Sequence, residues 1–229
     1  MRETLTGIVL AGGESRRLGQ PKPLIMLGGK LMLARVAESL KPVCRELILV
    51  VRQDQDDDTP DAGIALGMHV VTDTEPGRGP LAGLHAGLEA CLTPLAFVTG
   101  ADHPFLSRRL VTAMADAAGA SGGRPLTAVV PRAGDGLHPL HAVYPVAEWL
   151  PLVARSLAEG ATSPRRLVET AYESGYPPVD VMTGDEVEAH DPQLLSLLDI
   201  DTPDQLARAR RIAANWGQVV RPEIRPGPP

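Results

Sequence analysis

Short runs of β-branched and aliphatic residues alternate along the chain with segments in which apolar residues recur at helical spacing. The runs have the length and composition of strands buried on both faces of a sheet. They lie at residues 6–10, 47–51, 68–71, 95–99, 127–130 and 140–144. The runs at 6–10, 47–51 and 95–99 are followed by polar or glycine-rich breaks, as expected where a buried strand ends in a loop.

Helices are expected between these runs and after them. Apolar side chains recur every three or four residues in segments 33–40, 81–88 and 110–118, with Ser107 as the N-cap of the third. Two later helices are expected to begin at Ser163-Pro164 and Thr202-Pro203, because Ser or Thr followed by Pro is typical of an N-cap and the first helical position.

Strands that alternate with helices predict a single Rossmann-like, three-layer α/β/α domain around a mostly parallel, doubly wound sheet. We expect this domain to span residues 1–215 and the Pro/Gly-rich residues 216–229 to form a flexible tail. The polar segment 53–63 is predicted to be a turn. Its aspartates are interpreted as a solvated loop, with a metal cluster as the alternative.

Composition narrows the class of protein. The 229 residues are 44% hydrophobic and 22% charged, which is typical of a globular domain. A net charge of −6 does not indicate a basic surface that would bind nucleic acid or an anionic membrane. No apolar run has the length of a membrane span. Two cysteines are too few for a disulfide framework, and the N-terminus does not resemble a secretory signal, so a cytoplasmic location is expected.

The first candidate for chemistry is the loop at residues 10–22. It follows a predicted strand and carries paired glycines, a hydroxyl group, two guanidinium groups and an ammonium group. Glycines let backbone N–H groups approach phosphate oxygens, and Arg and Lys neutralise phosphate charge, so the composition suits a polyphosphate. It is neither a Walker A loop nor G-x-G-x-x-G. The alternative is a strand-to-helix turn with solvated basic residues.

This loop resembles the L-A-G-G-x-S-x-R-x-G-x-x-K signature of the nucleotidyltransferase superfamily that includes the molybdenum cofactor guanylyltransferases. Three further segments match that family in order, at residues 76–83, 102–106 and 199–206, so the resemblance spans about residues 6–210. The first motif is shared with cytidylyltransferases and sugar-phosphate nucleotidylyltransferases, whereas residues 79–83 are more characteristic of the guanylyl branch. Residues 199–203 are closer to the cytidylyl form.

The resemblance implies a role for each matched residue. It assigns nucleotide binding to Leu10, Ala11, Gly12, Gly13, Ser15, Lys22, Asp73, Gly79, Pro80, Leu81 and Asp102. Arg17 and Lys22 would bind the phosphates and, with Asp102, form the catalytic group. Asp102 would hold Mg²⁺, and Asp201 occupies the position of a second metal-side residue. For both aspartates, a role in helix entry is the alternative reading.

The implied reaction is Mg²⁺-dependent transfer of GMP from GTP to the phosphate of molybdopterin or molybdenum-loaded molybdopterin, with release of pyrophosphate. Transient contacts with other molybdenum cofactor biosynthesis proteins and with apo-molybdoenzymes would follow. Three alternatives stay open: a cytidylyltransferase acting on molybdopterin, a sugar- or polyol-phosphate nucleotidylyltransferase, and a non-catalytic GTP-binding cofactor carrier.

Some residues depart from the family pattern or have no assigned role. His103 stands where relatives commonly have Met, and Val50 where some have a polar nucleotide contact. Because histidine is a poor ligand for Mg²⁺, we expect a packing or hydrogen-bonding role for His103. His138 and His141 read as ordinary strand or rim residues, with a metal pair as the alternative. Arg165 and its neighbour at position 166 lie at a predicted helix start, where they either meet the phosphate of the acceptor or are exposed.

Overall fold

The central sheet of the protein is mixed and eight-stranded. A computed structural model describes residues 4–13, 17–73, 78–119, 125–134 and 136–216. The strands are β1 (Leu5–Leu10), β4 (Glu46–Arg52), β5 (His69–Asp73), β6 (Leu95–Gly100), β7 (Ala128–Ala133), β8 (Gly136–Leu137), β9 (His141–Pro145) and β10 (Val179–Met182). Their order is β10-β7-β9-β6-β1-β4-β5, with β8 paired to β7.

Four strand pairings in this sheet are parallel, and three of them lie in the half from β6 to β5. β1 pairs in parallel with β4 and β6, β4 with β5, and β10 with β7. The three pairings that involve β8 or β9 are antiparallel. The predicted α/β fold with a mostly parallel, doubly wound sheet is therefore confirmed, with an antiparallel insertion at β9.

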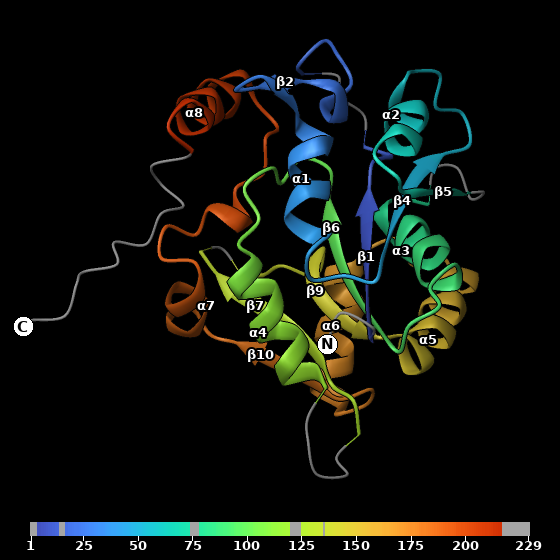
Figure 1. The fold of residues 1–229 in the computed structure, drawn as a ribbon. Coiled ribbons are helices and arrows are strands. Elements are labelled where there is room, and N and C mark those ends of the chain that lie inside the picture. The colour runs from blue at the N-terminus through green and yellow to red at the C-terminus, as the bar shows by residue number, and fades with distance from the viewer. Residues whose placement is uncertain (1–3, 14–16, 74–77, 120–124, 135, 217–229) are drawn as a thin grey trace, which may run out of the picture.

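Helices cover both faces of the sheet (Figure 1). They are α1 (Met32–Leu40), α2 (Thr59–Ala65), α3 (Pro80–Glu89), α4 (Arg108–Ala118), α5 (Val146–Ala158), α6 (Pro164–Ser174), α7 (Gly184–His190) and α8 (Pro203–Ala214). Two short 3-10 turns, η2 (Lys22–Leu24) and η3 (Leu195–Leu197), and the hairpin of β2 (Met26–Leu27) and β3 (Lys30–Leu31) complete the described elements.

Alternation along the buried strands divides the core into two clusters, because successive side chains of a strand point to opposite faces. Val9 packs with α1 and α4 on one face, whereas Ile8 packs with α3, α5 and α6 on the other. The second face also contains the largest buried side chain, Trp149, whose ring centroid lies 4.7 Å from that of Tyr144.

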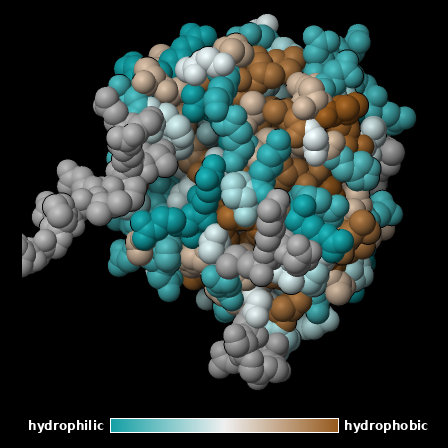
Figure 2. All heavy atoms as spheres, in the orientation of Figure 1, coloured by the Kyte–Doolittle hydropathy of each residue, from teal (hydrophilic) through white to brown (hydrophobic). Residues whose placement is uncertain are grey.

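Figure 2 shows a mostly polar surface on one side of the molecule, with apolar residues gathered toward α2.

A third cluster lies beyond the edge of the sheet and joins distant parts of the chain. Ile25 and Leu27 of the β2 region pack there against Ile200 and Leu206, which lie before and within α8. Figure 1 shows α8 beside β2 at one end of the molecule. Trp216 at the end of the described chain packs on Phe105, with ring centroids 4.9 Å apart, and the rest of the predicted tail lies outside the described residues.

The predicted helix starts are confirmed at three positions. The side chains of Ser107, Ser163 and Thr202 each accept a hydrogen bond from a backbone N–H in the first turn of α4, α6 and α8. The turn predicted for residues 53–63 is wrong in its second half, because α2 begins at Thr59. The carboxylate of Asp57 accepts the N–H of Thr59 at 2.8 Å, so the aspartate-rich segment supplies a helix start.

Among the described residues, no helix is both long enough and apolar enough to cross a lipid bilayer.

Candidate functional site

The site lies where four neighbouring parallel strands end. The register pairs Leu10 with both Val50 and Gly100, and Arg52 with Asp73, so β1, β4, β5 and β6 end at one edge of the sheet. The strand order reverses around β1, because β4 and β6 lie on opposite sides of it. In open α/β sheets, ligands bind in the crevice outside the carboxyl ends of strands at such a reversal.

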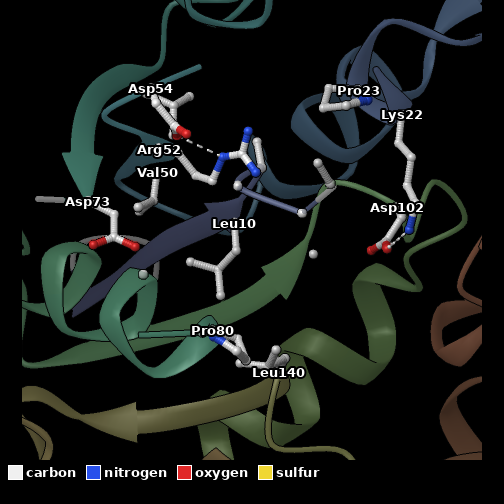
Figure 3. A pocket seen from close by; sticks show the side chains of 18 residues that line it. Leu10, Lys22, Pro23, Val50, Arg52, Asp54, Asp73, Pro80, Asp102 and Leu140 are labelled. Atoms are coloured by element: carbon white, nitrogen blue, oxygen red, sulfur yellow. Dashed lines mark hydrogen bonds and ion pairs between the residues drawn. The ribbon is translucent and has the colours of Figure 1, made fainter. Parts of the chain in front are cut away.

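A cavity of about 500 Å³ occupies this edge (Figure 3). It is large enough for a nucleotide-sized ligand. Its walls include most of the residues assigned to nucleotide binding from the sequence: Leu10, Ala11, Gly12, Gly13, Lys22, Asp73, Gly79, Pro80 and Asp102. Segments that lie far apart in the sequence therefore meet around one space.

Three of the assigned residues do not line this cavity. Arg17 is exposed, and Leu81 is fully buried in the core that α3 forms with the sheet. Asp201 lies outside the cavity wall but contacts Lys22. Ser15 falls outside the described residues.

Lys22 is the charged centre of the site. It begins η2 between Pro21 and Pro23, and each proline ring restricts the backbone on its side of the lysine. The Nζ atom donates to Oδ2 of Asp102 at 3.0 Å and to Oδ1 of Asp201. Burial by itself would lower the pKa of Lys22, but the negative charge of Asp102 and the hydrogen bonds to both aspartates raise it above its ordinary value. The ammonium group therefore stays charged.

Asp102 lies just beyond the end of β6, and its two carboxylate oxygens have different partners. Oδ2 accepts from Lys22, and Oδ1 lies 3.0 Å from Nδ1 of His103. Burial would raise the pKa of Asp102, but the hydrogen bond and charge of His103, and then those of Lys22, hold it well below its ordinary value. Gly100 leaves room for this arrangement, because a Cβ at that position would overlap Oδ1 of Asp102. His103, for which the sequence predicted a packing or hydrogen-bonding role, thus orients the carboxylate.

Asp201 is fixed by the start of α8. The side-chain oxygen of Gln205 accepts the N–H groups of Asp201 and Thr202 at 2.9 and 2.8 Å, and its amide nitrogen donates to Asp199 at 3.0 Å. Burial, followed by the negative charge of Asp201, raises the pKa of Asp199. The helix-entry role and the approach to Lys22 are therefore both observed for this segment.

The carboxylates at Lys22 are of the kind that a hard divalent cation prefers. Within the described ranges, no three His, Cys, Asp or Glu side chains are grouped to enclose a metal ion. Mg²⁺ commonly takes one or two protein carboxylates and completes its coordination with water and substrate phosphates. Asp102 and Asp201, held on either side of one ammonium group beside the cavity, fit that requirement.

Sequence reasoning missed the polar wall at the end of β4. Arg52 and Asp54 line the cavity, and Nε of Arg52 lies 3.1 Å from Oδ1 of Asp54 (Figure 3). Arg52 also lies against Gly12, where an added Cβ would stand 2.8 Å from its Cγ. The available signal was position, because Arg52 ends a buried parallel strand and Asp54 lies two residues beyond it.

A second cavity, of about 680 Å³, adjoins the first and shares Pro80 and Leu140 with it. His103, His138 and His141 contribute to its wall, as does Arg165. Three histidines that the family resemblance does not assign to nucleotide or metal binding therefore lie around one space. The two cavities meet near Gly79, which has a φ of +67° and would place a Cβ 3.2 Å from the carbonyl oxygen of Thr162.

Comparison with known proteins agrees with the sequence resemblance. Residues 7–175 match the model of the MobA-like NTP transferase domain. A molybdenum cofactor guanylyltransferase from Desulfosudis oleivorans is 32% identical over 210 residues, which cover 90% of this chain and 95% of that protein.

Solved structures agree on the fold. The molybdopterin-guanine dinucleotide biosynthesis protein A from Archaeoglobus fulgidus has a TM-score of 0.73 and 25% identity, with 92% of this chain and 99% of that chain covered. A 2-C-methyl-D-erythritol 4-phosphate cytidylyltransferase from Thermus thermophilus has a TM-score of 0.62 at 21% identity, with 90% and 97% covered. The backbone fold is therefore common to structures whose names refer to different bases.

Proposed function

The chain belongs to the MobA-like NTP transferase family, and from this premise we propose that it transfers GMP from GTP to the terminal phosphate of molybdopterin or molybdenum-loaded molybdopterin. The observation that carries the proposal is the contact of Lys22 with both Asp102 and Asp201 at the edge of a nucleotide-sized cavity. A cation held between two carboxylates beside glycine-rich walls is suited to phosphate chemistry.

The proposed reaction is a single displacement at phosphorus. An oxygen of the acceptor phosphate forms a bond to the α-phosphorus of GTP, and the bond from that phosphorus to the oxygen bridging to the β-phosphorus breaks. Pyrophosphate leaves with the electron pair of that bond. The attacking oxygen is already anionic at neutral pH, so the reaction needs neither a general base nor a covalent enzyme intermediate.

The residues of this chain act mainly by position and charge. The ammonium group of Lys22 neutralises charge on the phosphates, and Arg17 is proposed to assist it from the same loop. The pairing of Asp102 with His103 fixes the direction of one carboxylate oxygen. When bound by Asp102, with Asp201 nearby, Mg²⁺ would supply further neutralisation of the phosphate charge.

Guanine recognition is assigned to the part of the cavity formed by Leu10, Val50, Asp73 and Gly79. Asp73 carries a carboxylate that can accept from the N–H groups of guanine, and cytosine presents fewer donors. The family likeness at residues 79–83 also favours GTP.

We further propose a cytoplasmic location, and transient contacts with other cofactor biosynthesis proteins and apo-molybdoenzymes.

Base choice is tested by pyrophosphate release with molybdopterin as the acceptor and GTP, CTP or ATP as the donor. GTP is expected to give the highest kcat/KM. Equal or better turnover with CTP would assign the protein to the cytidylyl branch, and turnover only with a sugar or polyol phosphate would change the acceptor. Binding of GTP without pyrophosphate release would indicate a carrier.

The metal is tested in the same assay by titrating Mg²⁺ with the Asp102→Asn variant. Asn keeps the shape of the side chain and removes the charge that holds the ion, so turnover should fall by about 10²-fold or more while GTP binding persists. Asp116→Asn, an exposed change in α4, is the matched control. An unchanged rate and Mg²⁺ dependence in Asp102→Asn would mean that the metal is held elsewhere, with Asp201 the next candidate.

A further inference from the structure

The wall of the second cavity includes a side chain, His141, that has no role in the proposed reaction. His141 lies at the start of β9, opposite Thr99 of β6, and is only 1% exposed. Among the described residues, neither Nδ1 nor Nε2 of this buried ring has a hydrogen-bond partner. Leaving a buried polar group unsatisfied costs about 1–3 kcal/mol, so a partner from outside the protein would offset a real destabilisation.

The other two histidines of this wall are already engaged. Nε2 of His138 lies 3.0 Å from the carbonyl oxygen of Ala133, and Nδ1 of His103 lies 3.0 Å from Asp102. Each of these two rings therefore has a nitrogen in a hydrogen bond, whereas neither ring nitrogen of His141 has one.

The ring of His141 is held in place without hydrogen bonds. The Phe97 ring packs edge-on against it at 5.1 Å and 89°, and the centroid of His103 lies 5.7 Å away. Burial, followed by the charges of His103 and His138, lowers the pKa of His141 well below its ordinary value. A neutral imidazole has one donor and one acceptor. It is therefore better suited to bind an uncharged polar ring of a ligand than to bind a phosphate group.

The position of the cavity indicates which part of a substrate would reach this ring. The first cavity holds Lys22 and Asp102, and the second begins at the neighbouring His103. Figure 3 shows Pro80 and Leu140, which belong to both walls, side by side at the margin of the first cavity. A molecule whose phosphate lies at Lys22 can therefore extend its remaining atoms toward the histidines.

We propose that His141 forms a hydrogen bond with the polar ring system of the acceptor and so selects a phosphorylated, nitrogen-rich heterocycle. This inference rests on the proposed function, because it assumes a phosphorylated acceptor at Lys22. Arg165 lines the same cavity, and its guanidinium group donates to the carbonyl oxygen of Leu137, another lining residue, at 3.2 Å. His141 acts in binding and takes no part in bond breaking.

The test compares KM values for molybdopterin and for GTP in His141→Phe and His141→Gln. Phe keeps an aromatic ring against Phe97 and removes both nitrogens, whereas Gln restores one donor and one acceptor. His141→Phe is expected to raise the KM for molybdopterin about tenfold, as for the loss of one neutral hydrogen bond, with the KM for GTP unchanged. His141→Gln should recover part of that loss. His69→Phe, an exposed change in β5, is the matched control.

The outcomes separate the inference from the function on which it rests. Transfer by the wild-type protein with an unchanged KM for molybdopterin in both folded variants would overturn the role of His141 and leave the proposed function standing. Equal increases in both KM values would also overturn it, because that pattern indicates a general structural effect. Absence of transfer by the wild-type protein would overturn the proposed function and this inference together.

Discussion

Replacing Gly100 by Ala tests the placement of Asp102 without touching its charge. The backbone of Gly100 is not in the left-handed region, so Ala is accommodated at that residue without backbone strain. The new methyl group would overlap Oδ1 of Asp102 and stand 3.1 Å from Nδ1 of His103, whereas ordinary contacts begin at 3.4 Å. The carboxylate is the group that can yield, so it must turn away from its present position.

The expected effect follows from the size of that displacement. Relieving the overlap moves the oxygen by roughly 1 Å, and a misplacement of this size costs about 10²-fold in rate, or about 2.7 kcal/mol of transition-state stabilisation. The measurement is kcat for pyrophosphate release at saturating GTP, together with thermal melting. Gly184→Ala in α7 is the matched control, since the added Cβ would meet only the carbonyl oxygen of Arg132, at 3.8 Å.

Turnover of Gly100→Ala at the wild-type rate, with an unchanged melting temperature, would show that the direction of the Asp102 carboxylate does not matter for the reaction. A large fall in melting temperature alone would instead show that the β6 end is structural.

Two further predictions concern charge. Lys22→Ala should lower kcat/KM by about 10²-fold or more, since it removes one stabilising charge worth about 3 kcal/mol, and wild-type kinetics in the folded variant would contradict the role of Lys22. His141 should make the free energy of unfolding depend on pH, because its pKa in the folded protein is depressed. Below about pH 6.5 the imidazole is protonated in the unfolded chain but stays neutral in the folded protein. The free energy of unfolding then falls by up to about 1.4 kcal/mol for each pH unit. Urea unfolding at pH 7.5 and 5.5 should show a smaller loss in His141→Phe than in the wild type, and equal losses would contradict the assignment.

The parallel half of the molecule is predictable from the sequence because its information is local. A strand buried on both faces needs a continuous apolar run, and residues 6–10, 47–51 and 95–99 supply it. The same logic places the loop after β1 and Asp102 after β6 at one edge of the sheet. The N-caps at Ser107 and Thr202 are equally local, since a side chain bonds a backbone group three residues away.

The remaining features depend on contacts that no local pattern records. Apolar runs do not reveal strand direction, so the antiparallel pairing of β9 with β6 could not be read from residues 140–144. Polar residues favour loops, but the Asp57 carboxylate accepts a hydrogen bond from the N–H of Thr59, where α2 begins. The contact between Lys22 and Asp201 joins residues 179 positions apart, and packing of α8 on the β2 region brings them together.

That packing sets the moment at which the site first exists during synthesis. Chains emerge from the ribosome N-terminus first, so the glycine-rich loop, Lys22 and Asp102 are all available for folding before the segment that contains Asp201 has been made. Until this segment is made, Ile25 and Leu27 lack their contacts with Ile200 and Leu206, and Lys22 lacks one of its two carboxylates. A nascent chain that stops before this segment still lacks one carboxylate of the phosphate site, so synthesis of the segment must precede complete assembly of the active site.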